Sequence, residues 1–249
     1  MDNTTYIALS RQMGLQNQLE VVANNLANVN TTGFKGTDTL FAQYVFKLDQ
    51  NERAFKDKVA FVHDFGLIRN LSQGAFNYTG NTFDVALQGE GYFVLQGRGG
   101  VPNYTRAGVF NKNSEGFLVS MEGRLVLGTN GAPINIPADA TEIVIQGDGT
   151  IAEPNGRTFG QLQVVRFENE RNLKQVDGTA FRADGEEPIP LERPKVAQGV
   201  LEASNVSPVV EITRLIALNR AYQETARLIS QEDDRKKKAN EVFTRPAQA

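Results

Sequence analysis

Residues 15–35 read LQNQLEVVANNLANVNTTGFK, and this stretch organises the interpretation of the whole chain. Apolar side chains recur in it at spacings of four and three, at Leu15, Leu19, Val22, Leu26 and Val29. That spacing places them on one stripe of an α-helix. Gly33 follows the stripe, at a place where helices often end in a left-handed residue. The pattern predicts an N-terminal helix over residues 4–30.

The C-terminal end repeats this design. Ser207 and Pro208 make a suitable N-cap and first-turn pair. A second stripe follows at Ile212, Ile216, Asn219, Tyr222, Ala226 and Ile229. Each acid of residues 232–234 then stands four residues before a lysine of residues 236–238, which supports a helix. We interpret the basic run 235–238 as a solvated helical face rather than a site for an anionic partner, because the acids beside it cancel its charge.

The middle of the chain has a different composition. Nineteen of the 23 glycines fall between Gly74 and Gly199, and no proline precedes Pro102. Apolar and polar residues alternate over 83–88, as in a half-buried strand. Short apolar runs and turn dipeptides such as Asn130-Gly131 follow. This pattern predicts an antiparallel β domain of the sandwich or barrel-like kind.

We therefore expect an α+β fold, in which an antiparallel central β domain is flanked by two long helices. A single helix of this kind is marginal in water, so the two helices are expected to pair with each other in a coiled-coil-like layer and with the helices of neighbouring subunits. The expected segments are an N-terminal helix (1–33), an extended connector (34–75), a β domain (76–203) and a C-terminal helix with a tail (204–249).

The composition argues against several classes of function. A net charge of −3 is unsuited to a nucleic-acid-binding protein. With no cysteine and His63 as the only histidine, we expect no metal site, no cofactor and no catalytic residue. No apolar run is long enough for a membrane span, and the first residues have no basic region of a cleavable signal.

Four motifs resemble bacterial flagellar rod and hook proteins. The first is Ala23–Lys35, with its Asn-rich helix end and Thr-Gly-Phe-Lys exit. Gly89–Val94 is similar to the first β-domain motif of that family, and Tyr104–Phe110 to the segment after it. Ser204–Val206 and Asn219–Gln223 look like its terminal helix region. The matches follow the family's order, and the short connector resembles the proximal rod type; a distal rod subunit is the nearest alternative.

The resemblance implies a structural subunit that works by polymerising into the hollow rod of the flagellar basal body, which transmits torque. It implies export through the flagellar type III apparatus and assembly in the periplasm with copies of itself and with other rod subunits, but no insertion into the membrane. A secreted binding module with coiled-coil ends is the alternative from a different class.

The expected subunit interface lies on both terminal segments. Small residues there permit close helix approach, the asparagines can bond across a helix interface, Gly33 turns the chain and Phe34 anchors the exit. The full set is Leu15, Leu19, Val22, Ala23, Asn24, Asn25, Leu26, Ala27, Asn28, Val29, Gly33, Phe34, Ile212, Ile216, Asn219, Tyr222, Ala226 and Ile229.

Overall fold

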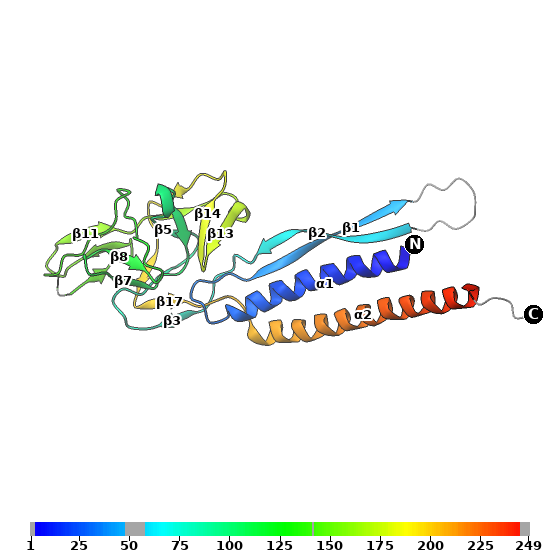
Figure 1. Cartoon of the computed structure of the whole chain (residues 1–249). Helices are drawn as coiled ribbons and strands as arrows, with labels where there is room; N and C mark the ends of the chain where they lie inside the picture. The colour runs from blue at the N-terminus through cyan, green and yellow to red at the C-terminus, as the bar shows by residue number, and fades with distance from the viewer. Residues whose placement is uncertain (1–2, 48–57, 141, 245–249) are drawn as a thin grey trace, which may run out of the picture. The chain divides into compact units, whose positions relative to one another are not determined.

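The computed structural model describes residues 3–47, 58–140 and 142–244, and these residues form two compact units (Figure 1). The helical unit comprises the described parts of residues 1–27, 37–69 and 207–249. The β unit comprises the described parts of residues 28–36 and 70–206. The α+β class is confirmed, with a helix near each end and antiparallel strands between them. None of the described helices combines the length and apolar character needed to cross a membrane.

The helical unit contains α1 (Asn3–Ala27) and α2 (Pro208–Thr244), which lie side by side and run in opposite directions (Figure 1). The first helix ends three residues earlier than the stripe predicts, and a turn closes over Asn28–Thr31. Towards the far end of α2, Glu232 pairs with Arg235 at 2.7 Å, and Lys236 Nζ donates to Thr5 Oγ1 at 2.9 Å. Lys236 thus contacts α1 instead of making the pair expected with Glu232.

Most of the expected connector is a regular element of this unit. Strands β1 (Thr37–Lys47) and β2 (Lys58–Arg69) form an antiparallel ladder that packs on α1. The register shifts between Leu40 and Phe41. Such an irregularity moves the later side chains to the other face of the strand and breaks the alternation that marks a strand in sequence. The ladder therefore escaped the sequence analysis.

All the strand ladders of the β unit are antiparallel, as expected. Its main sheet has six strands in the order β13-β14-β6-β5-β12-β15, beside smaller sheets β11-β10-β9, β16-β4, β17-β3 and β7-β8. The strands are β3 (Phe76–Tyr78), β4 (Val85–Leu87), β5 (Tyr92–Leu95), β6 (Asn103–Thr105), β7 (Phe110–Lys112), β8 (Leu118–Ser120), β9 (Val144–Ile145), β10 (Thr150–Ala152), β11 (Thr158–Gln161), β12 (Val164–Arg166), β13 (Leu173–Asp177), β14 (Ala180–Ala183), β15 (Ile189–Pro190), β16 (Val196–Gln198) and β17 (Val200–Glu202), with 3₁₀ turns at Arg98–Gly100 and Glu170–Asn172.

Strand β5 separates two apolar clusters. Phe93 and Leu95 belong to the larger cluster. The ring of Phe93 packs edge-to-face on the ring of Phe110, with 5.3 Å between the ring centroids. Tyr92 and Val94 point to the other side and belong to the second cluster. Successive side chains of a strand face opposite sides, so an unbroken apolar run is what a strand covered on both faces requires.

Candidate functional site

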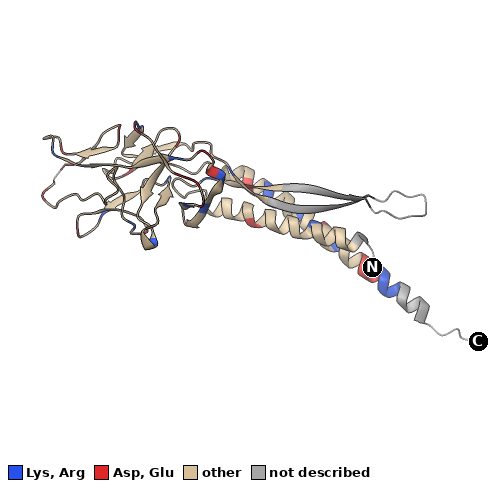
Figure 2. Ribbon diagram, turned by 90° about the horizontal axis from the view of Figure 1, so that it is seen from above, with Lys and Arg blue, Asp and Glu red and all other residues tan. Residues whose placement is uncertain are grey.

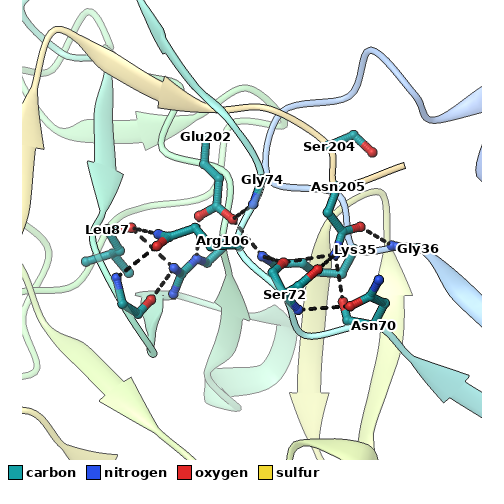
Figure 3. Close-up of polar contacts among 12 residues, drawn as sticks. Lys35, Gly36, Asn70, Ser72, Gly74, Leu87, Arg106, Glu202, Ser204 and Asn205 are labelled. Atoms are coloured by element: carbon teal, nitrogen blue, oxygen red, sulfur yellow. Dashed lines mark hydrogen bonds and ion pairs between the residues drawn. The ribbon is translucent and has the colours of Figure 1, made fainter. Parts of the chain in front are cut away.

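Three charged side chains meet inside the β unit and form what we call the clamp: Lys35, Arg106 and Glu202 (Figure 3). Lys35 Nζ lies 2.6 Å from Glu202 Oε1, and Arg106 Nε donates to Glu202 Oε2 at 2.7 Å. The backbone N–H of Gly74 also donates to Oε1, at 3.1 Å. All three side chains are 5% exposed or less. A buried carboxylate is stable only with such partners, so the clamp fixes three distant segments together.

Arg106 also holds the backbone of the Gly89–Val94 motif. Its guanidinium donates to Gly91 O at 2.5 Å and to Leu87 O at 3.2 Å, and it contacts Gly89 O as well. Lys35 Nζ donates its second bond to Ser72 O at 2.7 Å. Each cation is thus bonded to several acceptors of the protein, which suits a structural role.

Asn205 forms a hydrogen-bond cluster with Gly36, Asn70 and Ser72 beside the clamp, which we call the knot (Figure 3). Its Oδ1 accepts from the N–H of Gly36 at 2.8 Å, while its Nδ2 donates to Asn70 O and Ser72 O, each at 2.9 Å. These segments are the ones that continue along the chain into the helical unit. The knot and the clamp thus hold three of the four places where the β unit begins or ends, near residues 36, 70 and 206.

Gly33 is fitted into the same region. Its N–H donates to Glu202 O at 2.8 Å, and its φ is +69°. A Cβ atom at this position would lie 2.5 Å from the backbone nitrogen of Ala107 and 2.6 Å from the carbonyl carbon of Arg106. Only glycine allows this close approach in a left-handed conformation.

Burial and charge act in opposite directions on the clamp. Burial lowers the pKa of Lys35 below its usual value, although Glu202 opposes this through its hydrogen bond and charge. For Glu202, burial alone would raise the pKa. The hydrogen bond from Lys35 and the charge and hydrogen bond of Arg106 outweigh burial, so the pKa of this carboxyl lies below its usual value. The carboxylate is therefore charged at neutral pH.

The structure places the predicted interface residues of α1 in different surroundings. Val22 and Asn25 are buried within the helical unit. Asn25 exchanges two hydrogen bonds with the backbone of Thr37, at 2.8 and 3.0 Å, so its amide is satisfied inside its own chain. Leu15, Leu19 and Leu26 are half-buried, while Ala23, Asn24 and Ala27 are exposed.

The exit of the N-terminal segment lies in the β unit. Gly33 and Phe34 are buried there, and Asn28 and Val29 are half-buried. Asn28 Oδ1 accepts from the Thr31 hydroxyl at 3.1 Å, a local turn contact. Phe34 is thus buried within its own chain, where it can anchor the end of the N-terminal segment.

The predicted stripe of α2 combines two faces of the helix. Ile212, Ile216 and Asn219 are exposed, whereas Tyr222, Ala226 and Ile229 are half-buried. The less exposed face instead runs through Glu211, Leu215, Leu218, Tyr222, Thr225 and Ile229. Two of these positions are polar, and this is why an apolar pattern alone did not select this face in the first turns of α2.

Sequence reasoning missed Glu202, which is the centre of the clamp. Its only signal is an isolated acid at the end of an apolar strand, two residues before the Ser204–Val206 motif. No set of three or more His, Cys, Asp or Glu side chains within the described residues has the arrangement of a metal site.

Three family models match the chain. Residues 6–35 match the flagella basal body rod protein model, residues 86–153 the flagellar hook protein FlgE/F/G D1 domain, and residues 197–242 the flagellar basal body rod FlgEFG protein C-terminal region. Each matched region contributes one charged residue of the clamp: Lys35, Arg106 and Glu202 respectively.

The chain is also similar to curated proteins over almost its whole length. It is 38% identical to the flagellar basal-body rod protein FlgF of Caulobacter vibrioides, over 92% of this chain and 93% of that protein. It is 35% identical to the flagellar basal-body rod protein FlgG of Agrobacterium fabrum, over 92% of this chain and 94% of that protein. It is 31% identical to the FlgG protein of Bacillus subtilis, over 94% of this chain and 96% of that protein.

Proposed function

The chain belongs to the flagellar basal-body rod protein family, and on this premise we propose that it polymerises through the outer faces of α1 and α2 into the proximal part of the rod. It is a structural subunit of the basal-body rod, it is located in the periplasmic rod, and it is most like FlgF. The greater identity to an FlgF protein than to the FlgG proteins supports the proximal position over the distal one.

The observation that carries the proposal is a set of apolar side chains left in water on both helices. On α1, Leu9 is 47% and Met13 61% exposed. On α2, the outer stripe consists of Val209, Ile212 and Ile216, which are 73%, 47% and 47% exposed. Contiguous apolar surface of this kind is typical of protein–protein contacts. Its burial between subunits, at roughly 1.5–3 kcal/mol per large side chain, would supply the association energy.

The less exposed face of α2 supports a coiled-coil-like pairing with α1. Its positions, from Glu211 to Ile229, alternate at spacings of four and three, which is the 3.5-residue repeat of coiled coils. We propose that the axial segments are residues 1–33 and 204–249, with the β domain of 76–203 as the outer layer. The β1–β2 ladder then replaces most of the connector at 34–75.

Further parts of the proposal follow from the family. The subunit is exported by the flagellar type III apparatus, contacts copies of itself and other rod subunits, and helps to form a hollow shaft that transmits torque. It acts by assembly and without catalysis.

The test is to replace Ile216 by Asp in the full-length chain and to analyse basal bodies isolated from cells that express only this variant. We expect the variant to be missing from the rods and the cells to be non-motile, because a charge on the outer stripe opposes its burial. Gln231→Asp, at an exposed polar position of the same helix, is the matched control and should assemble. Normal incorporation of the Ile216→Asp variant would contradict the proposal.

A further inference from the structure

The helical unit has a groove where α1, β1 and α2 meet. The groove has a volume of about 300 Å³. Val21 and Val22 of α1 and Ala217 and Leu218 of α2 line it with apolar atoms, and Asp38 and Arg214 stand at its edge. An apolar groove with a charged edge is the general form of a site that accepts a side chain of a partner.

The charged side chains at the groove (Asp38 and Arg214) and directly beside it (Glu211) carry a net negative charge. Arg214 Nη1 lies 2.6 Å from Asp38 Oδ1 and 3.6 Å from Glu211 Oε1, so one guanidinium serves two carboxylates. Glu211 Oε2 is buried and has no hydrogen-bond partner among the described residues. The groove therefore suits a partner with apolar side chains followed by a cation.

The chain itself carries such a segment on α2. The outer stripe of Val209, Ile212 and Ile216 continues, one turn further on, to Arg220. Arg220 is exposed and makes no ion pair with a described residue. Figure 2 shows the charged residues of the helices from above.

A single molecule cannot fill its own groove with this stripe. Ile216 follows Arg214 by two residues, and at about 100° per residue their side chains point about 160° apart around the helix. The stripe and the groove thus belong to different flanks of the same unit. A contact between them joins unlike surfaces, which leaves a free groove and a free stripe at the two ends and builds a ring or an open helix.

We propose that the groove of one subunit receives Ile212 and Ile216 of a second copy of this chain, with Arg220 of that copy beside Asp38. This assignment rests on the proposed polymerisation and names the surface that accepts the outer stripe. It also explains why Ile212 and Ile216 remain exposed in the single chain although α2 packs on α1.

The chain has no cysteine, which permits a direct test by disulfide cross-linking. Cells express two full-length single-cysteine variants together, Ile216→Cys with one tag and Val21→Cys with another, and their basal bodies are isolated and oxidised. We expect a cross-linked pair that carries both tags, and no such product when Val21→Cys is replaced by Ser230→Cys, an exposed control on α2.

Adding Arg220→Glu to the Ile216→Cys chain should lower the yield of the mixed pair about two- to fivefold, the effect expected for one exposed ion pair. Arg227→Glu, an exposed arginine two turns further on, should leave the yield unchanged. Absence of the mixed pair would overturn the proposal. So would cross-linking of Ile216→Cys chains to each other, because this would mean that two outer stripes meet.

The two proposals fail separately. If Ile216→Asp is excluded from the rod but the mixed pair does not form, the groove assignment is wrong and polymerisation through α2 stands. If Ile216→Asp enters the rod normally, the proposed polymerisation through the outer stripe of α2 is wrong.

Discussion

Lys35 and Glu202 are 167 residues apart in the chain, yet their charged groups lie 2.6 Å apart in the interior of the β unit. Arg106 holds the second oxygen of the same carboxylate. One acid is thus the shared counter-ion of two buried cations that come from distant parts of the sequence. The stability of the β unit should therefore depend far more on Glu202 than on any exposed acid.

Replacing Glu202 by Ala should lower the free energy of unfolding by about 3–5 kcal/mol, because two buried cations lose their counter-ion. Urea unfolding of the full-length chain, followed by tyrosine fluorescence, measures the change. Glu192→Ala is the control, since Glu192 is exposed, and it should change the stability by less than about 0.5 kcal/mol. Equal effects of the two variants would show that the clamp contributes little.

The clamp should also make the stability depend on acid pH. The pKa of Glu202 in the folded chain lies below its ordinary value of 4.5, so between these two values the unfolded chain binds more protons. The contribution of Glu202 is therefore present above pH 4.5 and is lost as the pH falls through the lowered pKa. The free energies of unfolding of the wild type and of Glu202→Gln should differ by an amount that shrinks from about pH 6 to about pH 3. A difference independent of pH would contradict this.

Gly33 should tolerate no side chain. Gly33→Ala places a methyl group 2.5 Å from the backbone of Ala107 and forces alanine into a left-handed conformation. Gly131 has a similar φ, +74°, but no atom within 4 Å of its Cβ position. Gly131→Ala should therefore cost only about 1–2 kcal/mol, the conformational term. Gly33→Ala should cost about 1–3 kcal/mol more, and thermal unfolding of both variants measures the difference.

Local patterns identified the helices and the β character of this chain, because each depends on residues only a few positions apart. The glycine and proline distribution separated the ends from the middle for the same reason. The β1–β2 ladder was missed because β2 has one extra residue opposite the step from Leu40 to Phe41, which interrupts the alternation of that strand. The clamp could not be predicted, since nothing local indicates that Lys35, Arg106 and Glu202 meet.

The predicted interface residues show a second limit of prediction from sequence. An apolar stripe says which residues prefer to be buried, but not whether the partner is the same chain or another one. Val22 and Ile212 were selected by the same criterion, yet the structure buries Val22 and exposes Ile212. Their roles can be separated only with the tertiary structure in hand.

This difference gives a final prediction. Val22→Asp introduces a charge at a position that is 5% exposed inside the helical unit, so it should unfold the pairing of α1 with α2 in the isolated subunit. Ile212→Asp changes a side chain that is 47% exposed and should leave the isolated subunit folded while blocking assembly. Circular dichroism and limited proteolysis of the purified chains distinguish the two: Val22→Asp should lose helical signal and become cleavable within 1–27 and 207–244, and Ile212→Asp should match the wild type. If both variants keep the helical signal, the burial of Val22 within one chain contributes little, and a contact of Val22 between subunits is favoured.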